Sequence, residues 1–317
     1  MMMASIPQQY IPQGFSRVSQ NGAWNNAIAQ NNYDLSQINT AYGKNRFDVT
    51  NGAAGKVYQQ GGFSGVINNT GNGYLNAVQK DSTWAMVNSQ NGAPFDITQT
   101  GTFGSFANVA GGGTINQDHS AYVTSWVGPG SGATINQNNA YDATVYTTNA
   151  GVTVNQDKVE YGTFVQHGGG GTFNQTAGYQ ALGYVADAGG TYNQTSQNNA
   201  IQLERSGGTV NQNGRSSLAY MIDSGTTLNQ TGGYWATGVQ FGGGSKAYQG
   251  NTINDFYVNG GQSTIDQGGK DAFRNRLVNT GNTKFSQNAI GDNIVWNNGG
   301  GVEGSQTSTS GVNWAVL

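Results

Sequence analysis

This chain of 317 residues contains no cysteine, four prolines and two histidines, and only 9% of its residues are charged. Without cysteine, it has no disulfide to staple a small fold together. No third ligand type clusters with His119 or His167, so the sequence predicts no metal site and no cofactor. No run approaches the roughly 18 apolar residues of a membrane span. A net charge of −3 without a basic stripe predicts no nucleic-acid partner.

The composition is rich in small and aromatic residues instead. Glycine supplies 51 residues and aromatics 11%, including 16 tyrosines and six tryptophans. A low-charge chain of this kind is often disordered or prion-like. Here the aromatics recur at fixed places, and the net charge is too small to keep the chain open by repulsion. These features favour a stacked β structure, in which side-chain ladders replace a large hydrophobic core.

A glutamine recurs about every 19 residues. The best copies of the repeat read Gly-Gly-Thr-Phe-Asn-Gln at 170–175 and Gly-Gly-Thr-Tyr-Asn-Gln at 189–194. A period this short and regular indicates one supersecondary unit per repeat, stacked on its neighbours. The intervals are 18 to 20 residues long, and the series is Gln59, Gln79, Gln99, Gln117, Gln137, Gln156, Gln175, Gln194, Gln212, Gln230, Gln249, Gln267, Gln287 and Gln306.

The repeat is too short for a helix-containing unit such as a tetratricopeptide of about 34 residues. Its glycines and its alternating β-branched and aromatic residues also oppose helix. A coil of 19 residues fits two strands and two turns. The sequence therefore predicts an all-β parallel β-solenoid of about fourteen two-strand coils over residues 56–317, after a non-repeating N-terminal segment of residues 1–55.

Strand alternation predicts which positions face inward. The position two before each glutamine is apolar, so it and the glutamine share the inner face; it holds Ile115, Ile135, Val154, Phe173, Tyr192, Val210, Leu228, Ala247, Ile265 and Phe285. Stacked amides can donate to one coil and accept from the next, which removes the cost of burying them. We also expect the position nine after each glutamine to close the core; it holds Trp126, Tyr146, Val165, Tyr184, Leu203, Met221, Val239, Val258 and Trp296.

Threonine and asparagine form a candidate surface ladder on seven successive coils. The pairs are Thr114/Asn116, Thr134/Asn136, Thr153/Asn155, Thr172/Asn174, Thr191/Asn193, Thr209/Asn211 and Thr227/Asn229. Ice-binding solenoids resemble this arrangement of short hydroxyl and amide side chains. The same ladder would also suit packing of neighbouring subunits, or it follows simply from strand and stacking preferences.

Acidic residues and the histidines predict no catalytic site. Asp118, His119, Asp157 and Glu160 follow the glutamine in the turn, where other coils have asparagine or threonine with the same turn-capping chemistry. Asp142 and Asp157 are carboxylates that can approach each other from adjacent coils. Polysaccharide-cleaving β-helices need such a pair in a groove, and nothing else in the sequence marks a cleft.

Residues 192–203 and 210–219 resemble curlin repeats, with their glutamine and asparagine ladders and a glycine-containing turn. The resemblance covers residues 55–310 and implies a two-strand-per-coil, amyloid-like solenoid without an enzymatic role. The repeat here is shorter. The first residues also lack the basic region and apolar run of an export signal.

The two ends depart from the repeat. Residues 11–15 read as an extended arm, and Asn25 to Thr40 as a short helix. A non-repeating segment before a solenoid is either a cap for the first coil or an attachment module. Residues 312–317 are apolar enough for a final capping strand or a self-association tail.

These patterns together predict a structural, non-enzymatic subunit of a virion fibre, spike or decoration, assembled in the host cytoplasm. Second strands such as 234–241 carry more large apolar residues than one core can hold, so we expect a multimer. The N-terminal segment would contact other virion proteins. The alternatives are an exported, curli-like extracellular fibre, and a tailspike that binds or cleaves a cell-surface glycan.

Overall fold

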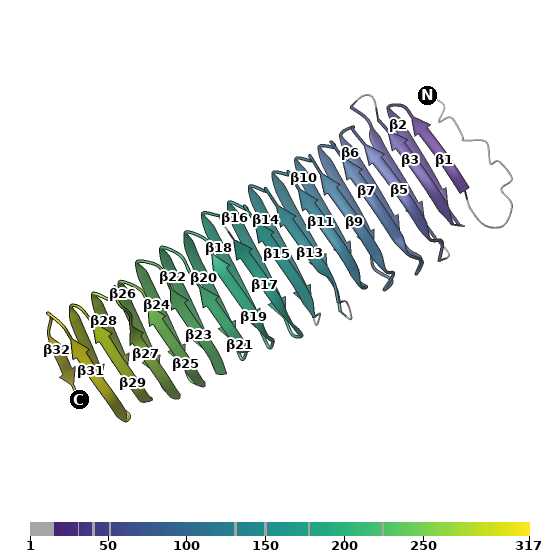
Figure 1. Cartoon of the computed structure of the whole chain (residues 1–317). Coiled ribbons are helices and arrows are strands. Elements are labelled where there is room, and N and C mark those ends of the chain that lie inside the picture. The colour runs from purple at the N-terminus through teal and green to yellow at the C-terminus, as the bar shows by residue number, and fades with distance from the viewer. Residues whose placement is uncertain are drawn as a thin grey trace.

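Two parallel sheets of sixteen strands each make up the fold. The chain alternates between them, so each coil contributes one odd-numbered and one even-numbered strand, and the coils stack into a rod (Figure 1). The computed structural model describes residues 16–30, 32–39, 42–50, 52–129, 132–148, 151–176, 178–223 and 225–317. At about 4.8 Å per coil, sixteen coils give a rod roughly 75 Å long. The predicted all-β parallel solenoid is confirmed.

The odd-numbered strands form sheet A: β1 (Ser16–Asn21), β3 (Tyr33–Ile38), β5 (Gly55–Gln60), β7 (Leu75–Lys80), β9 (Phe95–Thr100), β11 (Gly113–Asp118), β13 (Thr134–Asn138), β15 (Val152–Asp157), β17 (Gly170–Thr176), β19 (Gly189–Thr195), β21 (Gly207–Gln212), β23 (Gly225–Thr231), β25 (Gly244–Gly250), β27 (Gln262–Gly268), β29 (Asn282–Ala289) and β31 (Val302–Ser308). The even-numbered strands form sheet B: β2 (Trp24–Ala29), β4 (Lys44–Val49), β6 (Ser64–Asn69), β8 (Trp84–Ser89), β10 (Gly104–Val109), β12 (Tyr122–Val127), β14 (Asp142–Thr148), β16 (Tyr161–His167), β18 (Gln180–Ala186), β20 (Asn198–Glu204), β22 (Ser216–Ile222), β24 (Trp235–Phe241), β26 (Ile253–Asn259), β28 (Arg274–Asn279), β30 (Asp292–Asn297) and β32 (Asn313–Val316).

The repeat begins earlier than the sequence indicated. β1 to β4 lie within residues 1–55 and pair in register with the strands that follow. Gln20 and Gln37 extend the glutamine series, but they are 17 residues apart and Gln37 is 22 residues before Gln59, outside the window of 18 to 20. The short helix predicted from Asn25 to Thr40 is wrong, because β2 and β3 occupy that stretch. The arm predicted at residues 11–15 lies outside the described residues.

The predicted inner column two before each glutamine is confirmed. Its members are buried, with Phe285 partly so, and they join one apolar core that runs from Ala29 to Val295. At the other end, the apolar segment 312–317 does contain a strand, β32, which pairs with β30 and leaves all four of its residues exposed.

The second predicted inner column is wrong for several coils. Trp126 and Trp296 are 48% and 43% exposed, whereas Leu203 is fully buried. The turn after the glutamine varies by one residue: a buried residue stands eight positions after Gln117 but seven after Gln194. A shift of one residue turns a strand side chain to the opposite face, so the position nine after the glutamine faces the core in some coils and the solvent in others.

A small residue makes room for a cluster of stacked rings in the core. Phe164 of β16 stacks on Phe173 at a ring-centroid distance of 4.1 Å, and Tyr192 stacks on both rings. The next inward residue of sheet B is Gly183, where a Cβ would lie 2.5 Å from the Phe164 ring. The glycine therefore makes room for the ring beside it, as close packing requires.

The turns change their geometry midway along the rod. From β5 to β15, the residue after each strand of sheet A has a positive φ, in the left-handed region: Gly61, Asp81, Gly101, His119, Asn139 and Lys158. From β16 to β26, the residue with a positive φ is the one after each strand of sheet B: Gly168, Asp187, Arg205, Asp223, Gly242 and Gly260. Gly, Asn and Asp tolerate this conformation best, and they hold nine of the twelve positions.

Candidate functional site

The glutamine ladder runs the length of the rod. Each Nε2 donates to the Oε1 of the preceding glutamine, from Gln37 onto Gln20 through to Gln306 onto Gln287, at 2.6–2.9 Å. The ladder glutamines from Gln37 to Gln287 are almost completely buried. The predicted inward ladder is therefore present, and it includes two glutamines that the period had missed.

Each ladder amide also bonds across the core. The second N–H of Gln99 donates to the backbone carbonyl of Phe106 at 3.1 Å, and that of Gln267 to the carbonyl of Arg276 at 3.0 Å. Every other rung from Gln37 to Gln306 makes the equivalent bond to sheet B. The ladder thus joins the two sheets as well as the coils. This second hydrogen bond could be expected from the sequence, because a primary amide has two N–H donors and stacking uses only one of them.

The outer face of sheet A carries a second, polar ladder of asparagines over β11 to β23. Each Nδ2 donates to the Oδ1 of the asparagine one coil earlier, at 2.7–2.9 Å. The members in chain order are Asn116, Asn136, Asn155, Asn174, Asn193, Asn211 and Asn229. Beyond Asn229 the column continues as Tyr248, and the ladder ends.

The asparagines of this ladder leave little of their amides available to a ligand. The five interior members are half-buried, and each uses its Nδ2 and its Oδ1 on its two neighbours; they are Asn136, Asn155, Asn174, Asn193 and Asn211. These asparagines lie on the outer face, as predicted, and their amides are largely used within the ladder. The cause is the stacking itself, because amides in register at the strand spacing satisfy and cover one another.

The threonines predicted beside these asparagines are in register with one another. Thr227 is exposed, and the other six are half-buried: Thr114, Thr134, Thr153, Thr172, Thr191 and Thr209. The candidate surface ladder is therefore a strip of asparagine amides that are hydrogen-bonded to one another and flanked by threonines.

All six tryptophans of the chain lie on sheet B and point outward. Their exposed fractions run from 43% to 73%, and they are Trp24, Trp84, Trp126, Trp235, Trp296 and Trp314. Sequence reasoning placed two of them in the core. The outer face of sheet B is consequently the more apolar face of the rod, opposite the amide strip of sheet A.

An aromatic spine runs along the corner where β8 to β18 begin. It consists of Trp84, Phe103, Tyr122, Tyr141, Tyr161 and Tyr179, one ring from each of six successive coils. Neighbouring rings meet edge to face, with centroids 5.2–6.1 Å apart. Five of the six side chains are 44–52% exposed. The spine leaves a periodic row of half-exposed rings on the surface.

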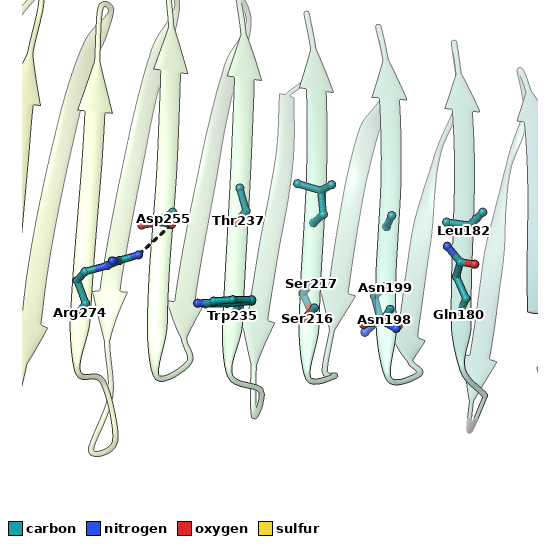
Figure 2. A pocket seen from close by; sticks show the side chains of 12 residues that line it. Gln180, Leu182, Asn198, Asn199, Ser216, Ser217, Trp235, Thr237, Asp255 and Arg274 are labelled. Carbon is teal, nitrogen blue, oxygen red and sulfur yellow. Dashed lines mark hydrogen bonds and ion pairs between the residues drawn. The ribbon is translucent and has the colours of Figure 1, made fainter.

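A groove of about 410 Å³ crosses the outer face of sheet B beyond the end of the spine. Figure 2 shows it running across the strands from Gln180 and Leu182 of β18 to Arg274 of β28. Its lining also includes Asn198, Asn199, Ala200, Ser216, Ser217, Leu218, Trp235, Thr237 and Asp255. A second depression, of about 670 Å³, lies on sheet A between β25 and β31 and is lined by Lys246, Lys284 and Glu303 among others.

The acidic candidates occupy turns and separate faces. His119 has a φ of 50°, and its Nδ1 lies 2.7 Å from Asp118 Oδ2. Partial burial would raise the pKa of the Asp118 carboxyl, but hydrogen bonds from Asn139 and His119 outweigh it and the pKa is lowered. Asp142 lies on sheet B and Asp157 on sheet A, where Asp157 accepts a bond from Thr176. The structure does not bring the predicted carboxylate pair onto one face.

The described residues contain no group of three or more His, Asp or Glu side chains placed to hold a metal ion. Nor do they form a helix that is long and apolar enough to cross a membrane. The fold and its surfaces define a two-sheet parallel β-solenoid with an internal amide ladder. Comparison with protein-family models, with curated proteins and with solved structures finds no match.

Proposed function

We propose that this chain is a structural, non-enzymatic rod whose copies associate side by side through the aromatic spine. The spine itself is the observation that carries the proposal. A row of half-exposed aromatic rings is larger than the scattered apolar residues usual on a monomer, and such patches mark interaction surfaces.

A second copy suits the spine because it has the same period. Rings that recur once per coil can interdigitate with an identical row, and a two-fold axis would make the two surfaces self-complementary. The six rings expose roughly 600 Å² per copy, if each leaves about half of its surface uncovered. Two copies would bury about 1,200 Å², which reaches the lower range of specific interfaces.

The test is the mass of the particle in solution. Phe103→Ser and Tyr141→Ser together remove two exposed rings from turns and leave the core unchanged. Light scattering should show a multimer for the natural protein and a shift toward monomer for the double variant. Trp296→Ser is the control, because it removes an exposed ring from the same sheet outside the spine. A natural protein that is monomeric at micromolar concentration would contradict the proposal.

The finer proposal is that this multimer is a virion fibre, spike or decoration, docked to other virion proteins through its N-terminal coils. It is supported by the form of the molecule, a rod of uniform coils that suits a spacer between an attachment point and a surface (Figure 1). The gene neighbourhood tests it directly. Capsid and tail genes on either side are expected, whereas secretion genes would point to the exported, curli-like fibre instead.

A further inference from the structure

The groove across sheet B has the features of a ligand site rather than of a self-association surface. It lies beyond the spine, and its floor is made of short polar and small side chains instead of a row of rings. In register along the stack, Gln180, Asn198 and Ser216 lead up to Trp235. The indole of Trp235, 51% exposed, is seen edge-on between Ser216 on one side and Asp255 and Arg274 on the other (Figure 2).

The lining combines an apolar surface with uncharged hydrogen-bonding groups. Leu182 and the Trp235 ring are the exposed apolar parts, and the amides and hydroxyls of Gln180, Asn198 and Thr237 can each both donate and accept. Sugar rings have matching chemistry: their C–H faces pack on aromatic rings and their hydroxyls bond to amides. The groove spans β18 to β28, about 24 Å at the strand spacing, so it suits a chain of sugars better than a single one.

The charged end of the groove adds specificity. Arg276 donates to both carboxylate oxygens of Asp255 at 3.1 Å and also contacts the Tyr257 hydroxyl, so its guanidinium is well paired. Arg274 makes one long contact to Asp255, at 3.5 Å, and its side chain is 38% exposed. Asp255 thus serves two arginines, and Arg274 also lies in register with Asp292 of β30, to which the described residues show no ion pair. The Nε of Arg274 has no hydrogen-bond partner in the described part of the chain, so its guanidinium keeps donors that Asp255 does not use. The planar fork of an arginine fits an incoming carboxylate well.

We propose that this groove binds an acidic oligosaccharide. Trp235 packs on a sugar ring, the amides and hydroxyls of β18 to β24 bond to sugar hydroxyls, and Arg274 binds the acidic group of one sugar unit. The site does not depend on the association of copies through the spine.

The experiment is an array of neutral, uronic-acid-bearing, sialylated and sulfated oligosaccharides, probed with the full-length protein. The strongest acidic glycan on the array is then titrated by calorimetry. We expect acidic glycans to be preferred over neutral ones of the same length. Trp235→Ala and Arg274→Gln should each weaken binding about tenfold or more, in line with the loss of a stacking or charge-assisted contact.

Two further variants make the result decisive. Ala200→Tyr fills the floor from an outward-facing position and should abolish binding while circular dichroism and particle mass stay unchanged. Trp126→Ala removes an equally exposed tryptophan, 48%, from the same sheet outside the groove and should leave the affinity unchanged. Absence of any preference for acidic glycans would overturn the proposal. Binding that survives Ala200→Tyr, or that Trp126→Ala weakens as much as Trp235→Ala does, would also overturn it. The spine variants should leave glycan binding intact, so the two proposals fail separately.

Discussion

Replacing one rung of the glutamine ladder should destabilise the rod by an amount that the hydrogen bonds predict. Gln175 Nε2 donates to Gln156 Oε1 at 2.7 Å and to the Leu182 carbonyl at 3.4 Å, and Gln175 Oε1 accepts from Gln194 at 2.8 Å. In Gln175→Leu, the Gln156 oxygen loses its donor in a dry core. The Gln194 amide keeps two backbone acceptors, at 3.2 and 3.4 Å. A buried group left unpaired costs about 1–3 kcal/mol, so the loss of the donor to the Gln156 oxygen should destabilise the rod by about 1–3 kcal/mol.

Gln175→Glu separates hydrogen bonding from side-chain shape. At neutral pH the carboxylate has no N–H and faces the Gln156 oxygen and the Leu182 carbonyl, so it should be worse than leucine. Burial among acceptors should raise the pKa of the new carboxyl above its unfolded value of about 4.3. The folded form is then least disfavoured below that value, where the acid can donate again, and the penalty grows as pH rises through the raised pKa.

The assay is denaturant unfolding of the natural protein and both variants between pH 4 and pH 8, followed by circular dichroism. Asn213→Asp is the control, because it introduces the same charge in an exposed turn and should be nearly silent. The reasoning fails if Gln175→Leu unfolds like the natural protein. It also fails if the glutamate variant gains nothing, relative to the natural protein, from acidification.

Three other changes have outcomes that the structure fixes. Gly238→Ala places a Cβ 2.3 Å from the buried Phe256 ring and should cost about 1–3 kcal/mol in denaturant unfolding, whereas Gly189→Ala meets no atom within 4 Å and should not destabilise. Burial raises the pKa of the Tyr192 hydroxyl, so its contribution to the free energy of unfolding should be fully present below pH about 10 and fall as pH rises above it. Tyr192→Phe should make this alkaline loss of stability shallower in a pH series of unfolding curves. Deleting residues 1–54 removes the first two coils and should leave a β-rich rod by circular dichroism, because coils contact only their neighbours; loss of the β signal would contradict this independence of the coils.

The architecture was predictable because the same chemistry recurs in every coil. A glutamine with an apolar residue two positions before it forces both onto the inner face, and this signal survives changes of one residue in the turns. The first two coils were missed because the intervals before Gln37 and Gln59 are 17 and 22 residues, so a search for a near-constant period stops at Gln59. The strands of these coils nevertheless pair in register with their neighbours.

The facing of sheet B was not predictable from a fixed offset. One residue more or less in the turn reverses the side chain's direction, which is why Trp126 is outside and Leu203 inside at the same distance from a glutamine. The groove depends on which short side chains become neighbours across separate coils, and the varying turn lengths hide that alignment in the sequence.

The most direct test of the account is the exchange of glutamine side-chain amide protons in heavy water, followed by NMR of the ¹⁵N-labelled protein. The fourteen ladder glutamines from Gln37 to Gln287 are buried, and each donates both to another glutamine and to a carbonyl of sheet B. Their amide protons should therefore exchange orders of magnitude more slowly than those of exposed glutamines, with protection lost only when coils open. Rapid exchange of all glutamine side chains in the folded protein would contradict the ladder and the solenoid built around it.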